Sequence, residues 1–476
     1  MSINKFFRQH YPIIIILTIF LLLRLKVTLQ FFDLVFDGAI YIGQAKYIYS
    51  FGSAGYFEPL RPLVVPIFLG IGWILGYDMV VWGKFIEIIF SLGTLVLTYI
   101  IASKLQNRAA GVLAAAVLAI TPMFFLYSDK ILTGIPSAFF ALLSFYFFMN
   151  DKFRLAGFFA AVSFMTRFPQ GILLAAYFFV FLISFLQAKN RKAICSEFAE
   201  FLVPYAIVAS IFLIFNAFKY SSADTLAEAM FWPFMHGSFT ISTAGLWMYQ
   251  GQWHYYILGL LKENYILVFS ILFIFYYVYD IRYKQEAFNL LVIAPVLMLA
   301  YFTQLLHKEI RFALIFVPYL AIMAGIAIAR VYDFAKSRSR ILVVFWALIL
   351  LIVLVMRTPI PEMKEYVSPD VSDVCSFINN MNYTGQVILT TPYPLYCLDN
   401  KVEMNLYSIP KLLETADENP DWLLVYAPET FVCQPDDNEC SDEKSRALRL
   451  FKSRYELLYL NNSTELPIYV FKRPSS

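Results

Sequence analysis

Two acidic residues directly follow the first long apolar segment of the chain and could act on a substrate at the edge of a membrane. Asp33 and Asp37 are four residues apart, just beyond the apolar stretch 12–30. A carboxylate at a membrane boundary is costly and is usually kept for a function. Because a positioned carboxylate can exchange a proton with a substrate, Asp37 is the first candidate for a catalytic residue and Asp33 the second. The alternatives are that Asp37 only caps a helix and that Asp33 is only interfacial.

Five cations could hold an anionic group on the same side of the membrane. His307, Lys308 and Arg311 lie close together between two apolar stretches. Lys308 and Arg311 are three residues apart, so at the start of a helix they would share a face, and a helix N-terminus itself attracts phosphate. A bound anion explains such a cluster well, because arginine and lysine both bind phosphate. Arg61 and Arg167 are further candidates for the same phosphate.

Each of these cations also has a structural alternative. Glu309 could balance the charges beside it, Arg61 could pair with Glu58, and Arg167 could be a structural anchor whose stem lies along apolar surface. The sequence holds no glycine-rich phosphate loop, no Gly-x-Ser-x-Gly motif and no His/Cys spacing typical of metal ligands. No metal-binding residue and no cofactor are therefore predicted, although a divalent metal is compatible with the pattern.

The composition is that of a membrane protein built from helices. Of the 476 residues, 60% are hydrophobic and 15% are charged, whereas about 25% of the residues of a soluble domain are charged. The apolar residues fall in blocks of about 17–25, the length that crosses the hydrocarbon core as a helix. The net charge of +3 is too small and too dispersed to indicate nucleic acid binding. We therefore predict an α-helical multi-pass membrane protein.

About eleven transmembrane helices are predicted, and the charges of their loops indicate the orientation. Lys and Arg concentrate in every second loop, which favours a cytoplasmic N-terminus and a C-terminus outside. The segment 62–76, rich in Gly and Pro, is predicted to be a re-entrant or interfacial helix in or on the outer leaflet. Residues 37–47 predict an amphipathic helix on the outer surface, and the outside loop 219–253 a lid at the interface. The predicted spans are 12–30, 79–103, 109–127, 131–149, 155–169, 171–187, 198–218, 258–280, 287–306, 310–329 and 341–356.

The chain divides into a membrane domain, residues 1–356, and a more polar region, residues 357–476, predicted to be soluble and outside. In the second region short β-rich runs alternate with helical patterns, which is typical of a small α/β domain. The predicted strands are Val387–Thr391, Trp422–Tyr426, Tyr455–Leu460 and Ile468–Phe471. The predicted helices are Val371–Met381, Leu406–Thr415 and Ser441–Ser453.

Cysteines and glycosylation sequons support the outside location of this region. An even number of cysteines in an exported region indicates disulfides. The candidates are Cys375, Cys397, Cys433 and Cys440. Their pairing stays open, although Cys433 with Cys440 is locally plausible. The sequons begin at Asn382, Asn461 and Asn462.

Five short segments follow one another along the predicted outer side of the membrane domain: 37–41 (DGAIY), 58–63 (EPLRPL), 131–136 (ILTGIP), 164–168 (FMTRF) and 307–312 (HKEIRF). In their order and sidedness they resemble the GT-C superfamily of glycosyltransferases, and the overall layout is similar to the protein O-mannosyltransferase and lipid A aminoarabinose transferase group, particularly its archaeal-looking members. The last segment is also similar to one in dolichyl-phosphate-mannose-dependent mannosyltransferases. The resemblance covers most of the membrane domain.

The resemblance implies an integral-membrane enzyme that moves a single sugar, a hexose such as mannose, from a polyprenyl- or dolichyl-phosphate donor to a hydroxyl of a glycan, lipid or protein. Transfer would invert the anomeric centre on the outer or lumenal face, with Asp37 as base and the cations around the donor phosphate. The enzyme would lie among the lipids of the plasma membrane, or of the endoplasmic reticulum in a eukaryote. A multi-span transporter or flippase and a non-catalytic membrane binding protein are the alternatives.

Two positions depart from the family pattern. Gly38 follows Asp37 where a second acid is frequent, and Gly134 stands where an Asp is frequent, for which Asp129 could substitute. These departures count against a metal-dependent or two-carboxylate mechanism. The Trp-Trp-Asp signature of oligosaccharyltransferases is absent from the sequence, which argues against transfer of whole glycans to asparagine.

Overall fold

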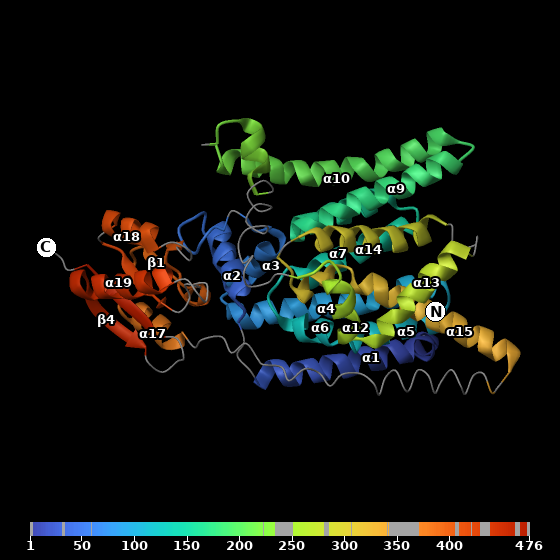
Figure 1. Cartoon of the computed structure of the whole chain (residues 1–476), viewed down its shortest axis with the longest axis horizontal. Coiled ribbons are helices and arrows are strands. Elements are labelled where there is room, and N and C mark those ends of the chain that lie inside the picture. The colour runs from blue at the N-terminus through green and yellow to red at the C-terminus, as the bar shows by residue number, and fades with distance from the viewer. Residues whose placement is uncertain are drawn as a thin grey trace. The chain divides into compact units, whose positions relative to one another are not determined.

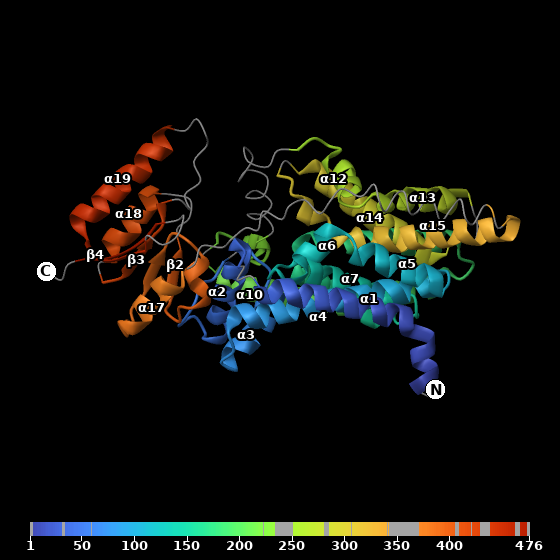
Figure 2. The same cartoon turned by 90° about the horizontal axis from the view of Figure 1, so that it is seen from below.

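The structure is a computed structural model in which the chain forms two compact units (Figures 1 and 2). The helical unit consists of Met1–Gln30 and Ile86–Lys364, and the mixed unit of Phe31–Phe85 and Glu365–Ser476. The sequence did not indicate that residues 31–85 join the C-terminal region in one unit. The residues described are 3–30, 34–58, 60–221, 223–233, 251–279, 285–305, 307–339, 341, 371–404, 409–419, 421–428, 438–461 and 467–473.

Six helices are long and apolar enough to cross a membrane, or seven if one bent pair counts as a span, among the residues described. The pair Arg108–Ala119 and Pro122–Asp129 is bent by 67°. The six are His10–Leu29 in α1 (Ile3–Gln30), α4 (Met79–Leu105), Phe168–Gln187 formed by η2 (Phe168–Gly171) and α9 (Ile172–Gln187), α10 (Arg191–Lys219), α14 (Glu286–Gln304) and α15 (Val317–Arg338). The chain is thus a mostly helical, multi-pass membrane protein, while the count of eleven spans stays a prediction.

Four further apolar helices among the described residues are shorter than a membrane span. They are α3 (Val64–Ile74), α7 (Gly134–Phe148), α8 (Phe153–Thr166) and the stretch Tyr265–Tyr279 formed by η3 (Tyr265–Leu267) and α13 (Val268–Tyr279). Three of them, all but α3, fall on predicted spans and account for part of the difference in count. The 11 residues of α3 reach about 16 Å, roughly half of the hydrocarbon thickness. This length suits the expected re-entrant segment. The predicted span 341–356, apart from residue 341, and residues 234–250 of the predicted lid lie outside the described residues.

The bent pair breaks where the sequence places Thr121 and Pro122. α5 (Arg108–Ala119) ends just before them, and Pro122 begins α6 (Pro122–Leu126), which proline favours because it has no N–H to satisfy there. The break is stabilised from outside: the Asn264 side chain donates to Thr121 Oγ1 at 3.0 Å, and Glu263 Oε2 accepts from the Met123 backbone at 2.9 Å. α12 (Tyr255–Glu263) thereby holds the first turn of α6.

Small residues allow helices of this unit to approach closely. A Cβ on Gly325 of α15 would lie 2.5 Å from the backbone nitrogen of Ala114 in α5, and one on Gly157 of α8 would lie 1.9 Å from the carbonyl oxygen of Phe201 in α10. Backbones in direct contact gain van der Waals packing, which is the main attraction between helices in lipid. Either position therefore accepts only glycine without a shift of the helices.

The mixed unit contains a five-stranded sheet in the order β2-β1-β3-β5-β4. The strands are β1 (Val387–Leu389), β2 (Val402–Met404), β3 (Leu423–Tyr426), β4 (Glu456–Asn461) and β5 (Ile468–Lys472). β1 is parallel to β2 and β3, with Val387 opposite Val402 and Leu423, whereas β5 is antiparallel to both of its neighbours. Four strands lie where the sequence predicts them. β2 was missed because three residues of mixed polarity carry no clear pattern.

Helices cover both faces of this sheet (Figure 2). α18 (Ile409–Glu418) and α19 (Asn438–Arg454) pack on one face, where Leu412 and Phe451 share a buried cluster with Ile388 and Leu424. α17 (Ser372–Asn380) lies on the other face, where Phe377 stacks on Tyr459 of β4 at 4.7 Å between ring centroids. A small α/β domain was the expected architecture for this part of the chain.

Residues 31–85 are tied into the same unit by hydrogen bonds to the edge of the sheet. Gly55 pairs with the chain just before β2: its N–H donates to Asn400 O at 2.8 Å, and its carbonyl accepts from Val402 N at 2.9 Å. Gly55 has a φ of +74°, and a Cβ there would lie 2.2 Å from the carbonyl oxygen of Gly43. Only glycine fits both conditions without strain.

α2 (Phe36–Tyr49) is buried all round and is not the surface helix that the sequence predicts. Every residue from Gly38 to Lys46 is buried. The helix packs against α3 and against η6 (Tyr393–Tyr396), so no face is left for a membrane surface. A helix that is covered on all sides needs apolar residues on all sides. One partner of α2, η6, comes from a segment far along the chain, which the sequence of α2 does not reveal.

Candidate functional site

Asp37 lies in the first turn of α2 and is held by an arginine. The N-cap of this helix is Val35, which has extended backbone angles (φ −70°, ψ 151°), so Asp37 is the second helical residue and not the cap itself. Its Oδ1 accepts a hydrogen bond from Arg61 Nη2 at 2.8 Å. The side chains of Asp37 and Arg61 are 23% and 21% exposed. The carboxylate is therefore oriented by a fixed cation and still reaches the surface of the unit.

Arg61 is fixed in turn by its surroundings. Its guanidinium carbon lies 5.2 Å from the centre of the Tyr41 ring, one turn of α2 beyond Asp37. The Gln44 side chain of the same helix donates to the carbonyl of Glu58 at 3.3 Å, which fixes the segment that carries the arginine. Burial alone would lower the pKa of Arg61, but Asp37, Tyr41 and Glu58 together raise it. The arginine thus stays charged at any pH of interest.

Glu58 is a second acid beside this arginine. Burial raises the pKa of Glu58, and Arg61 opposes this only in part. In the part of the chain that the structure describes, the ion-pair partner of Arg61 within 4 Å is Asp37 and not Glu58, in contrast to the structural alternative for Arg61. The other predicted base, Asp33, lies outside the described residues.

The segment 307–312 forms a second group of charges, in the helical unit. Glu309 is bracketed by two cations: its Oε1 lies 2.7 Å from His307 Nε2 and accepts from Arg311 Nη2 at 3.0 Å, while Oε2 accepts from Arg311 Nε. Burial would raise the pKa of Glu309, but the hydrogen bonds from His307 and Arg311 outweigh it and the pKa is lowered. The Glu309 carboxylate therefore neutralises the charge of Arg311, as the structural alternative for this cluster expects.

The aromatic ring of Phe312 gathers the cations of this segment. The guanidinium carbon of Arg167 lies 5.2 Å from its centre, that of Arg311 5.9 Å, and the His307 ring 5.6 Å. Arg167 also donates to Thr133 Oγ1 at 3.2 Å. Three predicted phosphate-binding residues are thus brought together. Thr133 and Phe312 lie in two of the short segments that carried the resemblance, but the sequence analysis gave neither of them a role.

Lys308 differs from its neighbours because its charge is buried without a carboxylate. Its side chain is 5% exposed, and Nζ donates to the carbonyl of Leu305. Within the described residues it has no ion pair. Its stem packs on Gly251, where a Cβ would lie 2.8 Å from the lysine Cδ. Burial lowers the pKa of Lys308, so the site lacks a counter-charge that would favour the protonated lysine.

Lys308 and Arg311 do not share a helical face as predicted. The helical turn η5 (Ile310–Ile315) begins after Lys308, and its N-cap Glu309 is extended, with φ −125° and ψ 137°. The expectation is wrong because the His307–Glu309–Arg311 bonds hold the chain extended at that point. Lys308 and Arg311 consequently point to different partners.

Asp129 is not available to replace the aspartate that the family frequently has where this chain has Gly134. It forms an ion pair with Arg24, and both side chains are buried. Thr28 also donates to its Oδ2 at 2.7 Å. The ion pair also stabilises Arg24, because a buried arginine near the end of a span needs a buried acid.

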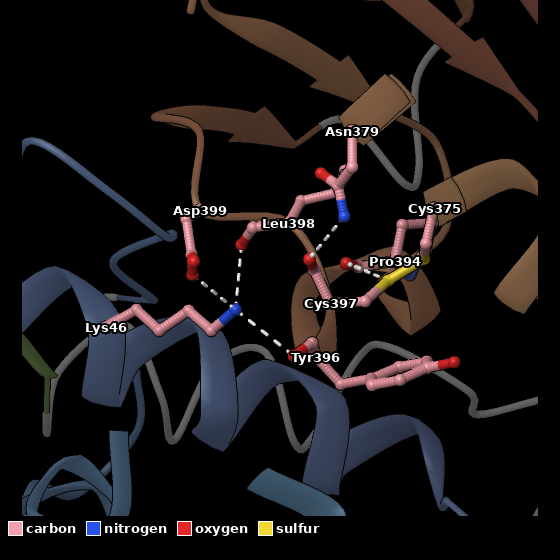
Figure 3. The surroundings of a disulfide bond; sticks show 8 residues. All are labelled: Lys46, Cys375, Asn379, Pro394, Tyr396, Cys397, Leu398 and Asp399. Atoms are coloured by element: carbon pink, nitrogen blue, oxygen red, sulfur yellow. Dashed lines mark hydrogen bonds and ion pairs between the residues drawn. A yellow bond between two sulfur atoms is a disulfide. The ribbon is translucent and has the colours of Figure 1, made fainter. Parts of the chain in front are cut away.

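The structure also bears on the predicted disulfides and on metal binding. Cys375 and Cys397 form a disulfide (Figure 3), which the sequence left open among other pairings. Cys433 lies outside the described residues, so its suggested pairing with Cys440 stays a prediction. Over the described ranges, no group of three or more His, Cys, Asp or Glu side chains could hold a metal ion.

Solved structures with the same fold come from two kinds of transferase. ArnT from Cupriavidus metallidurans, an aminoarabinose transferase crystallised with undecaprenyl phosphate, is 11% identical, with a TM-score of 0.66 over 97% of this chain and 98% of that one. The Archaeoglobus fulgidus oligosaccharyltransferase in its apo form is 12% identical, with a TM-score of 0.66 over 100% of this chain and 75% of that one.

A further structure of the Archaeoglobus protein, AglB, in complex with an inhibitory peptide and a dolichol-phosphate, is 12% identical, with a TM-score of 0.64 over 98% and 75% of the two chains. No protein-family model matches the sequence, and neither does any curated protein. Identity at this level shows a common fold and nothing finer. The chain therefore has the fold of the GT-C superfamily, to which ArnT and AglB both belong.

Proposed function

We propose that the protein is an integral-membrane glycosyltransferase that moves a single sugar, a hexose such as mannose, from a polyprenyl- or dolichyl-phosphate to a hydroxyl of a glycan, lipid or protein. The observation that carries the proposal is Asp37, a partly exposed carboxylate oriented by Arg61 at 2.8 Å, in a chain with the GT-C fold. It is supported by the neighbours, one bound to undecaprenyl phosphate and another to dolichol-phosphate.

Asp37 is the proposed general base. As the acceptor oxygen attacks the anomeric carbon, its proton passes to the carboxylate, and the bond between that carbon and the phosphate oxygen breaks. The products are the glycosylated acceptor with inverted configuration, the lipid phosphate and a protonated Asp37. Arg61 holds Oδ1 and so fixes the direction of the carboxylate, a positioning effect that accounts for much of catalysis. Asp33 is the second candidate for the base.

The lipid phosphate leaves with the bonding electrons and needs positive charge more than a proton. Lys308 is the best candidate, because a buried ammonium without a counter-charge is costly and gains most from an anion. Arg311, His307 and Arg167 would assist it through the arrangement around Phe312. Arg61 is a further candidate, since a guanidinium has five donors and one is used for Asp37.

The proposal includes the orientation of the chain in its membrane. About eleven crossings would leave the N-terminus in the cytoplasm and residues 357–476 outside, in a plasma membrane or, in a eukaryote, in the endoplasmic reticulum. The outside α/β domain would then face the compartment in which the acceptor is found. Donor and acceptor partners would be a lipid-phosphate sugar and a glycan, glycolipid or protein.

The experiment measures release of free polyprenyl phosphate by purified protein. A panel of polyprenyl-phosphate sugars is supplied with a crude pool of glycolipid and glycopeptide acceptors, and wild type is compared with Asp37→Asn. Because a positioned base contributes about 10²–10⁴ in rate, the variant should lose roughly 3–5 kcal/mol of barrier lowering. Donors that support release identify the sugar.

Asp373→Asn is the matched control for this variant. Asp373 is likewise the second residue of its helix, α17, and lies exposed in the same unit. If Asp37 acted only on the helix dipole, the two substitutions would have similar, small effects. Equal release by wild type and Asp37→Asn would move the base elsewhere. No release by either folded protein would favour the transporter or binding-protein alternative.

A further inference from the structure

Lys46 is a buried cation on the helix that carries Asp37. It lies nine residues after Asp37 in α2, and its side chain is 2% exposed. Nζ donates to the carbonyls of Tyr396 at 3.1 Å and Leu398 at 2.8 Å, and lies 2.9 Å from Asp399 Oδ1 (Figure 3). A lysine ammonium has three donors, so all three have an acceptor in one loop.

A disulfide closes the loop that supplies these acceptors. Cys397 stands between Tyr396 and Leu398 and is joined to Cys375 of α17. Asn379 of the same helix donates to the carbonyl of Cys397 at 3.4 Å (Figure 3). Two carbonyls that bind Lys46 are therefore adjacent in sequence to a residue that is fixed covalently. The loop has little freedom to follow the lysine if α2 moves.

The same loop meets α2 at two further points, which extend toward Asp37. A Cβ on Gly43 would lie 2.8 Å from a methyl carbon of Leu395, so the two segments are in direct contact. Tyr393 packs edge-on against Phe36, the residue before Asp37, with 6.3 Å between ring centroids. One face of α2 thus rests on residues 393–399 from its first turn to its last.

Neither the Asp37–Arg61 pair nor the sheet needs a lysine at position 46 for its own hydrogen bonds. A methionine of similar length would fill the same space without the cost of a buried charge. Replacing a buried ion pair by apolar side chains is often neutral or stabilising. The lysine instead fixes the position of the helix, because two backbone carbonyls of one loop, with Asp399 beside them, define where the helix must lie along and around its axis.

We propose that Lys46 is a positioning residue for sugar transfer: together with the disulfide-closed loop 396–399, it sets the position of α2 and hence of the Asp37 carboxylate. The inference rests on the proposed role of Asp37 as base. Lys46 does not touch the substrates in this proposal and acts through Asp37 alone. Displacing a catalytic group by about 1 Å can cost about 100-fold in rate.

The test is a double-mutant cycle on the full-length purified protein. Lys46→Met should lower kcat about 10–100-fold and leave the Kd for polyprenyl phosphate within about twofold. In the Asp37→Asn background the same substitution should cost less than about twofold, because residues that act as one unit are not additive. Lys401→Met, an exposed lysine of the same unit, is the matched control and should leave all of these values unchanged.

Equal losses from Lys46→Met in both backgrounds would overturn the proposal, since a lysine that only stabilises the fold lowers the active fraction whatever stands at position 37. Hydrogen exchange over residues 36–49 gives a reading independent of activity. It should become faster in Lys46→Met and stay unchanged in Lys401→Met. If exchange does not change, Lys46 does not position α2. If exchange changes but Asp37→Asn keeps the wild-type rate, the positioning stands and the proposed base fails.

Two further variants separate the contributions of Asp399 and of the disulfide to the positioning of α2. Asp399→Asn should have a small effect, below about fivefold, because Asp399 is 68% exposed and such ion pairs contribute little. Cys397→Ser removes the covalent closure but leaves the carbonyls, and should speed exchange over residues 36–49 less than Lys46→Met does. If exchange in Cys397→Ser equals that of wild type, the disulfide does not help to position α2. The positioning would then depend on Lys46 and the two carbonyls alone.

Discussion

The surroundings of Asp37 and the segment 307–312 use charge in opposite ways. Around Asp37, two acids share one arginine, and that arginine is fixed by Tyr41. In the segment 307–312, the one carboxylate is Glu309, and cations surround it. The first arrangement orients a carboxylate and leaves acid in excess. The second collects positive charge and leaves a lysine, Lys308, without a counter-ion among the described residues.

Under the proposed function, the two regions would serve different halves of the transfer reaction. A base must accept a proton, so its neighbours have to orient it without supplying more cations than it can bind. A leaving phosphate carries charge that is stabilised by fixed donors in a site of low dielectric. Substitutions in one region should therefore change the rate and in the other the binding of the lipid phosphate, which is a testable contrast.

Lys308→Met should produce the largest change in binding of the lipid phosphate. Loss of a charged hydrogen-bond donor is worth about 1.5–3 kcal/mol, so we expect the Kd for polyprenyl phosphate to rise roughly 10- to 100-fold. Because burial lowers the pKa of Lys308, wild-type binding should weaken as the pH rises through that value, below the ordinary lysine pKa of about 10.4. Titration with polyprenyl phosphate at several pH values measures both effects.

Lys152→Met, which removes an exposed lysine of the same unit, is the control and should leave the Kd unchanged. Lys308→Arg should keep binding but lose the alkaline decline, since arginine does not deprotonate in this range. Unchanged affinity in folded Lys308→Met protein would contradict the division of roles, and the phosphate would then have to be bound near Asp37, with Arg61 as the first residue to test.

Glu309→Gln should change binding in the opposite direction. Removing the one negative charge leaves the cations uncompensated. At an effective dielectric constant near 20 this favours an anion about 8 Å away by about 2 kcal/mol, roughly a 30-fold lower Kd for polyprenyl phosphate. Mild acid should not mimic the substitution. The pKa of Glu309 is lowered, so its ion pairs persist above the ordinary Glu value and are lost only as the pH falls through the lowered pKa.

If the charges of segment 307–312 only neutralised one another, Glu309→Gln would destabilise the protein without raising its affinity for polyprenyl phosphate. Affinity measured at two salt concentrations distinguishes these outcomes, because an added net charge makes binding more sensitive to salt. A Kd equal to that of wild type at both concentrations would therefore count against an anion site here.

The sequence alone predicts much of the fold. For the candidate site it indicates which residues could take part, but not which of them pair with one another. Apolar blocks and alternating strands indicate a multi-pass helical protein with a small α/β region, because both patterns are local. The pairings are not local: Arg61 is 24 residues from Asp37, and Arg24 is more than 100 from Asp129. Lys46 could have been noticed as a lone cation in an apolar helix, but its three acceptors lie about 350 residues away.

Arg167→Lys is expected to have a smaller effect on binding. The substitution keeps the charge but loses the planar group that stacks on Phe312 at 5.2 Å, a contact worth about 0.5–1 kcal/mol. The Kd for polyprenyl phosphate should rise about two- to fivefold, with a kcat close to that of wild type. Arg154→Lys, at an exposed ion pair with Glu200 of the same unit, should change neither. A large loss of kcat in Arg167→Lys would instead connect this arginine with the proton transfer.

The smallest predicted effect concerns the second acid beside Asp37. Burial raises the pKa of Glu58, with only partial relief from Arg61, so the folded protein prefers the protonated acid. This contribution to stability is fully present below the unfolded-state value of about 4.3 and is lost as the pH rises through the raised pKa. Glu58→Gln, which resembles the protonated acid, should therefore exceed wild type in Tm by roughly 1–2 °C at neutral pH, and the difference should vanish in acid. A Tm advantage that instead grew as the pH fell would mean that Glu58 is held ionised as a partner of Arg61. The arginine would then be neutralised by two carboxylates, and Glu58 would not be a surplus acid in this region.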